Sequence, residues 1–409
     1  MITVVQVRLP LLDVFRGFAI FGIFFINITI MHCLFINQDA YFSHYQDPVS
    51  QVINRVLQLF FYNKFFPIFS FLFGFGLATQ MLKKRQNKQA YIGFFSRRML
   101  ILLIFGLLHI HFLWSGDVLH LYAILGFLCL FLIHLKKKAL IWMAVVLLSF
   151  PFYEQLSEFI IQAFPVQLDA ALERYSEQGI IDVLRHGNYH AVINLHWHEY
   201  LANLPMLLFY LAPIALSMFL LGIAAGKSTL SLGSPQWVSH FQKTVISVAV
   251  IGVCYKVCFL FLLPGTALYT HDILRPLWFK LMFLSDITLG LCYLWGLAWL
   301  WHRALIQRLL MPLSYIGRMA LTNYLLHSVV GLFLFTHLGL GLYQTLSPAA
   351  CFAIALAVFF LQACSSAFWL RYFQYGPCEW LWRCGSYGTY FNLRRIKSNK
   401  PFVENNRAQ

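Results

Sequence analysis

Long, continuously apolar runs alternate with short polar segments along the whole chain. Runs of about 20 apolar residues match the hydrocarbon core of a bilayer, which is roughly 30 Å thick. We therefore predict about ten transmembrane helices. They are expected near residues 13–33, 57–81, 98–115, 117–135, 138–153, 204–226, 243–264, 280–301, 318–337 and 349–370. The predicted fold class is all-α, a polytopic transmembrane helical bundle.

The polar connections predict how such a bundle is oriented. Cytoplasmic loops of membrane proteins carry an excess of Lys and Arg. Placing both termini in the cytoplasm puts the basic segments 83–98, 136–138, 303–308 and 394–400 on that side. The long segment 154–203, which is rich in acidic residues and histidines, then becomes an outer loop.

Composition excludes a soluble protein. Hydrophobic residues make up 60% of the chain and charged residues only 11%, whereas soluble domains carry roughly 25% charged residues. The formal charge of +15 would suggest nucleic acid in a soluble protein. Here the cytoplasmic loops already explain it, so we expect the lipid bilayer as partner and no nucleic acid.

The first apolar run contains three polar residues, Asp13, Arg16 and Asn27. Polar groups at membrane depth are costly, so they need a partner or a function. Asp13 and Arg16 share a helix face and can pair. Arg16 could bind a phosphate or carboxylate of a substrate. Alternatively, the pair anchors the cytoplasmic end of the span.

His109 and Asp117 flank a predicted tight turn between two apolar runs. A buried histidine next to a carboxylate is the arrangement that a general base needs. We therefore predict these two as the catalytic candidates. The structural alternative is a helix cap for Asp117 and a hydrogen-bonded packing role for His109.

Further polar residues lie near the C-terminus. Asn323 and His327 are four residues apart and share a helix face behind Arg318, which suits substrate binding or hydrogen bonding between helices. Glu379 and Arg383 have the spacing of a helical salt bridge. His196 and His198 could ligate a metal with Glu199, but residues two apart do not share a helix face, so no metal site is predicted.

Five segments in order resemble the bacterial YeiB-like membrane proteins: LLDVFRGFAIFGIFFINI, KFFPIFSFLFGFGLA, RRMLILLIFGLLHIHFLWSGDVLHLYAILGFL, PLSYIGRMALTNYLLHS and GPCEWLWRCGSYG. The last is similar to the end of a DUF418 domain. The first two also resemble membrane acyltransferases of the heparan-alpha-glucosaminide N-acetyltransferase type. Those relatives carry an active histidine shortly before the FP pair, and the matching stretch LQLFFYNKFFPIF has none.

The resemblance implies an acyltransferase-like membrane half at 1–226, with the outer loop 154–203, and a DUF418-like membrane domain at 227–409 with a cytoplasmic tail. It implies a location in the bacterial inner (plasma) membrane. It further implies an enzyme that moves an acyl group from cytoplasmic acyl-CoA, bound near Arg16 and Arg318, to an envelope glycan or lipid near His109 and Asp117. No tightly bound cofactor is expected.

Two other functions remain open at this stage. Charged residues inside apolar runs, such as Lys256, are also typical of transporters for a small solute or lipid. No inverted repeat or matching pair of broken helices supports that function. A scaffold or sensor without catalysis is the third possibility.

Overall fold

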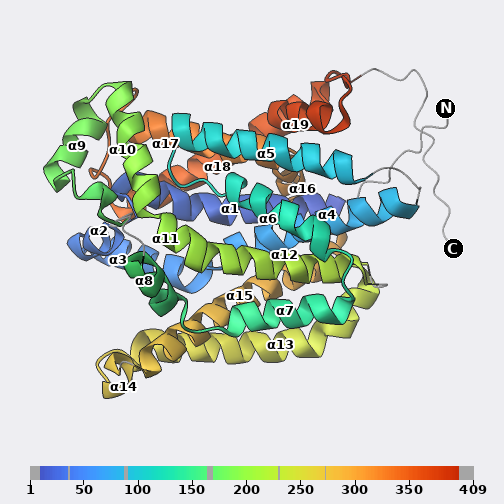
Figure 1. The fold of residues 1–409 in the computed structure, drawn as a ribbon, viewed down its shortest axis with the longest axis horizontal. Helices are drawn as coiled ribbons and strands as arrows, with labels where there is room; N and C mark the ends of the chain where they lie inside the picture. Colours follow the sequence, from blue (N-terminus) through green and yellow to red (C-terminus); the bar gives the residue numbers. More distant parts are fainter. Residues whose placement is uncertain are drawn as a thin grey trace.

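The computed structural model describes residues 10–35, 37–86, 91–163, 169–228, 231–271 and 273–395. These residues form helices and connecting loops, and in them no strand occurs beyond one isolated bridge between Phe373 and Arg394. The long helices run roughly alongside one another (Figure 1). The predicted all-α fold is therefore confirmed for the described part of the chain.

Seven described segments are long and apolar enough to cross a membrane. They contain α1 (Pro10–Cys33), α3 with η1 and α4 (Pro48–Val56, Leu57–Phe61, Phe65–Gln86), α5 (Ile92–Phe112), α11 with η3 and α12 (Leu204–Met206, Leu207–Leu211, Ala212–Gly226), α13 with η4 (Pro235–Val257, Cys258–Leu262), α15 (Leu274–Trp301) and α18 (Pro348–Tyr372). Such helices confirm a membrane-like helical protein.

Two bent helix pairs raise the number of possible spans to nine. They are α7 with α8 (Lys137–Ser149, Tyr153–Ala163), bent by 73°, and α16 with α17 (Ala304–Arg318, Ala320–Phe335), bent by 79°. A shorter apolar helix is α6 (Leu119–Leu132). The count of ten spans and the cytoplasmic side of the termini stay predictions.

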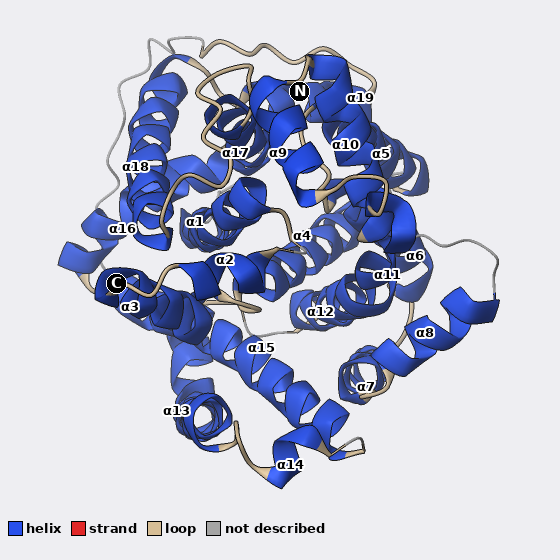
Figure 2. Cartoon of the chain, turned by 90° about the vertical axis from the view of Figure 1, so that its left-hand side faces the viewer, coloured by secondary structure: helices blue, strands red, loops and turns tan. Residues whose placement is uncertain are grey.

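Short helices gather at one end of the bundle (Figure 2). They are α2 (Gln38–His44), α9 (Glu177–His186) and α10 (Tyr189–Ala202), and η2 (Asp169–Leu172) contacts α10. Of these, α9, α10 and η2 come from the segment 154–203 that the sequence predicts as an outer loop; residues 164–168 of that segment lie outside the described part. We call this end the cavity end. The short α14 (Ala267–Thr270) links α13 to α15.

The opposite end carries α19 (Pro377–Tyr387) (Figure 1). The backbone N–H of Leu346, just before α18, donates to Nε2 of His32 in the last turn of α1. The end of α1 and the start of α18 therefore meet at the cavity end, and Pro10 and Tyr372 lie at the other. Parts of the predicted basic segments, residues 87–90 and 396–400, lie outside the described residues.

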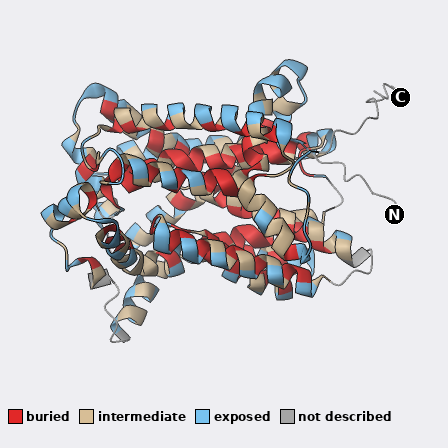
Figure 3. Ribbon diagram, turned by 90° about the horizontal axis from the view of Figure 1, so that it is seen from above, coloured by how far each residue is buried: buried red, intermediate tan, exposed pale blue. Residues whose placement is uncertain are grey.

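Buried residues line the inner faces of the long helices (Figure 3). Two seams depend on glycine. A Cβ on Gly17 of α1 would lie 2.0 Å from the carbonyl oxygen of Leu313 in α16, and one on Gly222 of α12 would lie 2.1 Å from that of Phe71 in α4. Only glycine allows such close backbone approach. These seams pack α1 against α16 and α4 against α12.

Irregular helical turns precede α4 and α12. The predicted span 57–81 is interrupted by the π-helical turn η1 and by Asn63, whose φ is +60°. Helix α12 is likewise preceded by the π-helical turn η3. Turns of this type widen a helix locally and occur frequently at functional sites. The loop that follows η1 and the turn η3 both face the interior at the cavity end.

Candidate functional site: a cavity beside two buried ionisable clusters

The principal cavity lies at the cavity end and has a volume of about 720 Å³. Drug-sized ligand pockets have roughly 300–1,000 Å³, so the space can hold a small molecule. Its polar walls come from several segments of the chain: Asn27, Gln38, Tyr62, Asn63, Ser115, Asp117, Tyr153, Glu154, Ser157, Glu158, Glu199, Tyr200, Asn203, Tyr210 and Tyr324. Of the ten predicted site residues, Asn27 and Asp117 line this cavity.

Asp117 lies in the turn between α5 and α6 and is bonded on both carboxylate oxygens. Its Oδ1 accepts from Nδ1 of His109 at 2.8 Å, and its Oδ2 accepts from the backbone N–H and from Nδ1 of His120, at 2.9 and 2.8 Å. The turn packs closely because Gly106 of α5 has no side chain: a Cβ there would lie 2.8 Å from Oδ2 of Asp117. We name these three ionisable residues the Asp117 cluster.

Hydrogen bonds determine the proton positions in the Asp117 cluster. A carboxylate can only accept, so both imidazoles donate from Nδ1. In the neutral imidazoles, Nε2 of His109 then accepts from Ser328 Oγ at 2.7 Å, and Nε2 of His120 accepts from the hydroxyl of Tyr200 at 3.2 Å. The pair of His109 and Asp117 is thus in contact, with both nitrogens of His109 engaged inside the protein.

Opposed influences act on the Asp117 carboxyl group. Burial raises its pKa, but the hydrogen bonds from His109 and His120 prevail and lower the pKa to about 2. Asp117 is therefore an ionised carboxylate at neutral pH. A fixed negative charge at the cavity wall attracts cations or hydrogen-bond donors of a bound molecule.

Glu199 of α10 lies on the cavity wall and has the opposite character. It is 1% exposed. Burial raises its pKa to about 7, although hydrogen bonds from Ser115 and the Phe35 backbone oppose the shift. The Ser115 hydroxyl donates to Oε2 of Glu199 at 2.5 Å. A carboxyl group with such a pKa can both accept and donate a proton at neutral pH.

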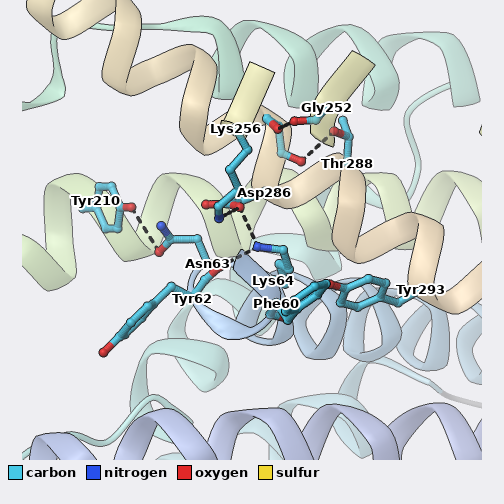
Figure 4. A network of polar contacts seen from close by, with 11 residues as sticks. Phe60, Tyr62, Asn63, Lys64, Tyr210, Gly252, Lys256, Asp286, Thr288 and Tyr293 are labelled. Carbon is cyan, nitrogen blue, oxygen red and sulfur yellow. Dashed lines mark hydrogen bonds and ion pairs between the residues drawn. The ribbon is translucent and has the colours of Figure 1, made fainter. Parts of the chain in front are cut away.

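A second buried cluster joins three helical elements near the cavity (Figure 4). Lys64, just before α4, donates to Oδ1 of Asp286 in α15 at 2.6 Å, and Lys256 of α13 donates to the same oxygen. Lys64 is 0% and Asp286 1% exposed. We call these three residues the lysine–aspartate cluster. Two ammonium groups and one carboxylate give it a formal charge of +1.

The lysine–aspartate cluster adjoins the cavity through its chain neighbours. Lys64 also donates to the carbonyl oxygen of Tyr62 at 3.3 Å. Tyr62 and Asn63 line the cavity. The hydroxyl of Tyr210, on the opposite wall, donates to Oδ1 of Asn63 at 3.4 Å. Figure 4 shows Tyr210, Asn63 and Lys64 following one another toward Asp286.

Other predicted site residues lie toward the opposite end. Asp13 accepts from Arg16 at 2.9 Å, which agrees with the predicted pairing. Along the axis of α1, Asp13 is about 21 Å and Arg16 about 17 Å from Asn27. Arg318 donates to the carbonyl oxygen of Gln374 at 3.4 Å. These residues therefore do not converge with His109 and Asp117 on one cavity.

The last four predicted residues make contacts between helices. Asn323 donates to Ser366 at 3.1 Å, and His327 pairs with Gln362 at 2.9 Å. Within the described part, no ion pair joins Glu379 to Arg383. Glu379 instead accepts from the backbone N–H groups of Leu321 and Thr322, at 2.6 and 3.1 Å, and so caps the start of α17. The guanidinium of Arg383 packs on three aromatic rings, at 4.6 to 5.1 Å from their centres.

Among the described residues, no group of three or more His, Cys, Asp or Glu side chains could hold a metal ion. His198 bonds to the carbonyl oxygen of Asn194 at 2.7 Å and is half-buried. His196 is buried, and burial, followed by the charge of His109, lowers its pKa to about 4. His196 and His198 thus have separate environments.

Three prominent residues of the site were not predicted. Lys64 lies near one end of the predicted span 57–81 and was not singled out, and neither was Asp286. A charged residue within an apolar run is the signal that could have found Asp286. Glu199 was weighed only as a metal ligand. Its cavity position depends on how α10 folds back over the α5–α6 turn.

Comparison with known proteins supplies the family. Residues 225–389 match the family described as "Protein of unknown function (DUF418)". The uncharacterized protein YxaH of Bacillus subtilis (strain 168) is 31% identical over 398 residues, covering 94% of this chain and 96% of that one. The uncharacterized protein YeiB of Escherichia coli (strain K12) is 27% identical, covering 91% and 94%. No solved structure matches. The chain therefore belongs to the YeiB-like family of DUF418 membrane proteins.

Proposed function

We propose that this protein is a membrane-bound enzyme that transfers an acyl group from acyl-CoA to a hydroxyl or amine held in the cavity. One observation carries the proposal: two carboxyl groups with widely separated pKa values, Asp117 and Glu199, lie on the same cavity wall. Pairs of groups whose environments separate their pKa values are typical of acid–base catalysis.

Glu199 is the general base in this proposal. The acceptor oxygen or nitrogen attacks the thioester carbonyl carbon, a C–O or C–N bond forms, and the C–S bond breaks. The acceptor proton passes to Glu199, whose pKa of about 7 suits that step at neutral pH. Glu199 then returns the proton to the departing thiolate, so the enzyme regenerates and the thiol leaves neutral.

Asp117 binds the acceptor, and His109 positions Asp117. The Asp117 carboxylate lines the cavity, where it can accept from an acceptor hydroxyl or amine. His109 does not line the cavity, and both of its ring nitrogens have protein partners. We therefore assign it a positioning role, behind Asp117, in place of the general-base role that the sequence suggests.

The acyl donor would approach from the opposite end. Arg16, whose side chain is 33% exposed, and Arg318 lie at that end, where a guanidinium fork suits the phosphates of a coenzyme. This division agrees with a donor and an acceptor that come from different sides of the bilayer. Excluding water between the two ends protects the thioester from hydrolysis.

The test offers acetyl-CoA labelled in its acetyl group to the purified protein in liposomes that contain envelope lipids. We expect labelled product with wild-type protein. Glu199→Gln and Asp117→Asn should each slow transfer about 10²–10⁴-fold, the range for loss of a general base. Glu177→Gln, at an exposed glutamate of α9, is the matched control and should leave the rate unchanged. Absence of transfer, or full activity of both cavity variants, would refute the proposal.

A transporter is the second candidate, because the lysine–aspartate cluster places three ionisable groups within spanning helices beside the cavity. Such groups are typical of ion and proton pathways. A transporter must open the cavity alternately to both faces. Asn27→Cys, labelled with a membrane-impermeant maleimide in vesicles of either orientation, separates the two functions. Labelling from one face favours the enzyme, and labelling from both favours transport.

A further inference from the structure

The cavity has an apolar part as well as a polar one. Ile23, Ile26 and Ile30 of α1 follow at helical spacing and face the same space as Phe66, Phe209 and Ile214. Ile26 and Ile30 remain only half-buried because they border this space. A site that bound only a sugar or a small polar solute would have no use for this surface. Apolar walls gain free energy by covering a hydrocarbon group.

The polar part has a distinct charge. The lining residues, all within the described part, include the carboxyl groups of Asp117, Glu154, Glu158 and Glu199 and no Lys, Arg or His. A head group with a net negative charge would be repelled by these carboxyl groups. An amine is attracted by them, and the hydroxyls of a polyol can donate to them.

Helix α8 borders the cavity at its side. Glu154, Ser157 and Glu158 line the cavity, whereas Leu156 and Phe159 are exposed, by 38% and 70%. Helix α8 is amphipathic and bends by 73° from the apolar helix α7, which suits a position in the membrane interface. Apolar side chains thus surround the cavity next to the predicted lipid boundary.

Side chains close the space between α8 and α15. The ammonium of Lys280 lies 5.0 Å from the ring centre of Tyr153 and 5.6 Å from that of Phe283. Tyr153 and Phe283 both line the cavity, and Lys280 is half-buried. These side chains therefore lie between α8 and α15 at the edge of the cavity.

We propose that the acceptor is an amphiphile, a lipid-linked amine or polyol that enters from the bilayer between α8 and α15. Its head lies at Asp117 and Glu199, and its hydrocarbon chain lies along the apolar faces of α1 and η3. This inference rests on the proposed function, because the bound amphiphile is called an acceptor, but the binding itself does not require catalysis.

The test uses a photoreactive phosphatidylethanolamine with a diazirine in its acyl chain, incorporated into liposomes with the full-length protein. We expect cross-links in peptides from α1, η3 and α12. The matched variants are Leu211→Trp, which places an indole in the cavity, and Leu208→Trp, which places one on the same turn at a side chain that is 48% exposed and does not line it. Size-exclusion chromatography establishes that both variants are folded.

Leu211→Trp should lower the cavity cross-links about tenfold, and Leu208→Trp should leave them unchanged. A water-soluble diazirine alkylamine should neither label these peptides nor compete. Equal labelling by the soluble amine, or equal loss in both variants, would overturn the inference. Cavity labelling without acyl transfer refutes the enzyme alone, and transfer to a soluble amine without lipid labelling refutes the amphiphile alone. If Leu211→Trp does not fold, Ile30→Trp replaces it at a half-buried cavity position.

Discussion

Replacing Asp286 by Asn should destabilise the protein more than any other single change in the lysine–aspartate cluster. The wild-type cluster has a formal charge of +1, and Asp286→Asn raises it to +2 while both ammonium groups lose their counter-ion. Lys256→Met lowers the charge to zero and keeps the pair of Lys64 and Asp286, which are 2.6 Å apart. The two single changes therefore act in opposite directions on the buried charge.

The magnitude follows from the burial of all three side chains, which are between 0% and 4% exposed. Removing one partner of a buried ion pair costs about 3–5 kcal/mol, because an uncompensated charge remains. Asp286 serves two lysines, so we expect the upper part of this range for Asp286→Asn. For Lys256→Met we expect less than about 2 kcal/mol, since the remaining pair is balanced.

Unfolding in detergent, followed by fluorescence-detected size-exclusion chromatography over a titration with sodium dodecyl sulfate, measures these differences. The triple variant Lys64→Met, Asp286→Leu, Lys256→Met is the control, because replacing a whole buried ion cluster by apolar residues is often neutral or stabilising by about 1–4 kcal/mol. The reasoning is refuted if Lys256→Met costs more than Asp286→Asn, or if the triple variant is as unstable as Asp286→Asn.

Three further changes test other parts of the site. Gly106→Ala should disrupt the Asp117 cluster and lower both stability and acyl transfer, because its Cβ would lie 2.3 Å from the backbone nitrogen of His120. The control is Gly93→Ala, on the same helix with open space around it. This control should be neutral or slightly stabilising in the same melting and activity assays. The pKa of Glu199 is about 7 in the folded state and 4.5 in the unfolded chain, so between these pH values the folded state holds a proton that the unfolded chain has lost. Stability should therefore fall as the pH rises from about 4.5 to 7. Glu199→Gln should make the melting temperature less dependent on pH in that window. Glu379→Ala should cost about 1–3 kcal/mol by leaving the N–H groups of Leu321 and Thr322 without an acceptor, whereas Arg383→Met, which keeps an apolar stem against the rings, should cost less in the same unfolding titration.

The helices themselves follow from the sequence, but their interruptions do not. Uninterrupted apolar runs can only satisfy their backbone groups in lipid by forming helices, which is why the spans are predictable. The break at Asn63 lies in the largely apolar stretch 57–66, where Lys64 is the single charged residue. Asn adopts a positive φ more easily than most residues, yet that tolerance does not require it to do so. Tertiary contacts of Lys64 decide the break.

Contacts between residues close in sequence could be predicted from their spacing, whereas contacts between residues far apart in sequence could not. His109 and Asp117 lie across one tight turn, so their contact could be read from the sequence. Lys64 and Asp286 are brought together from distant parts of the chain, and no alternation or spacing reports such a pair. Glu379 has a suitable partner four residues away in Arg383, but the start of α17 offers two backbone donors to its buried carboxyl group. A charge-assisted bond to backbone N–H groups prevails there over a surface salt bridge, which contributes little.

The cavity lies where the break at Asn63 faces the π-helical turn η3, next to a closely packed seam between α4 and α12. On the side away from the cavity, α4 and α12 are in backbone contact through Gly74 and Gly222, so the two helices are held at a short distance. At the cavity end, the π-helical turns η1 and η3 precede α4 and α12 and shift the path of the chain. Residues that follow η1 and those within η3, such as Asn63 and Tyr210, then line the space that opens between them. The same break that widens the cavity also turns Lys64 toward Asp286 and places that ion cluster directly behind the wall. A substitution that restored a continuous helix at Asn63 would therefore change the cavity and the buried charge together, which explains why the two features occur side by side.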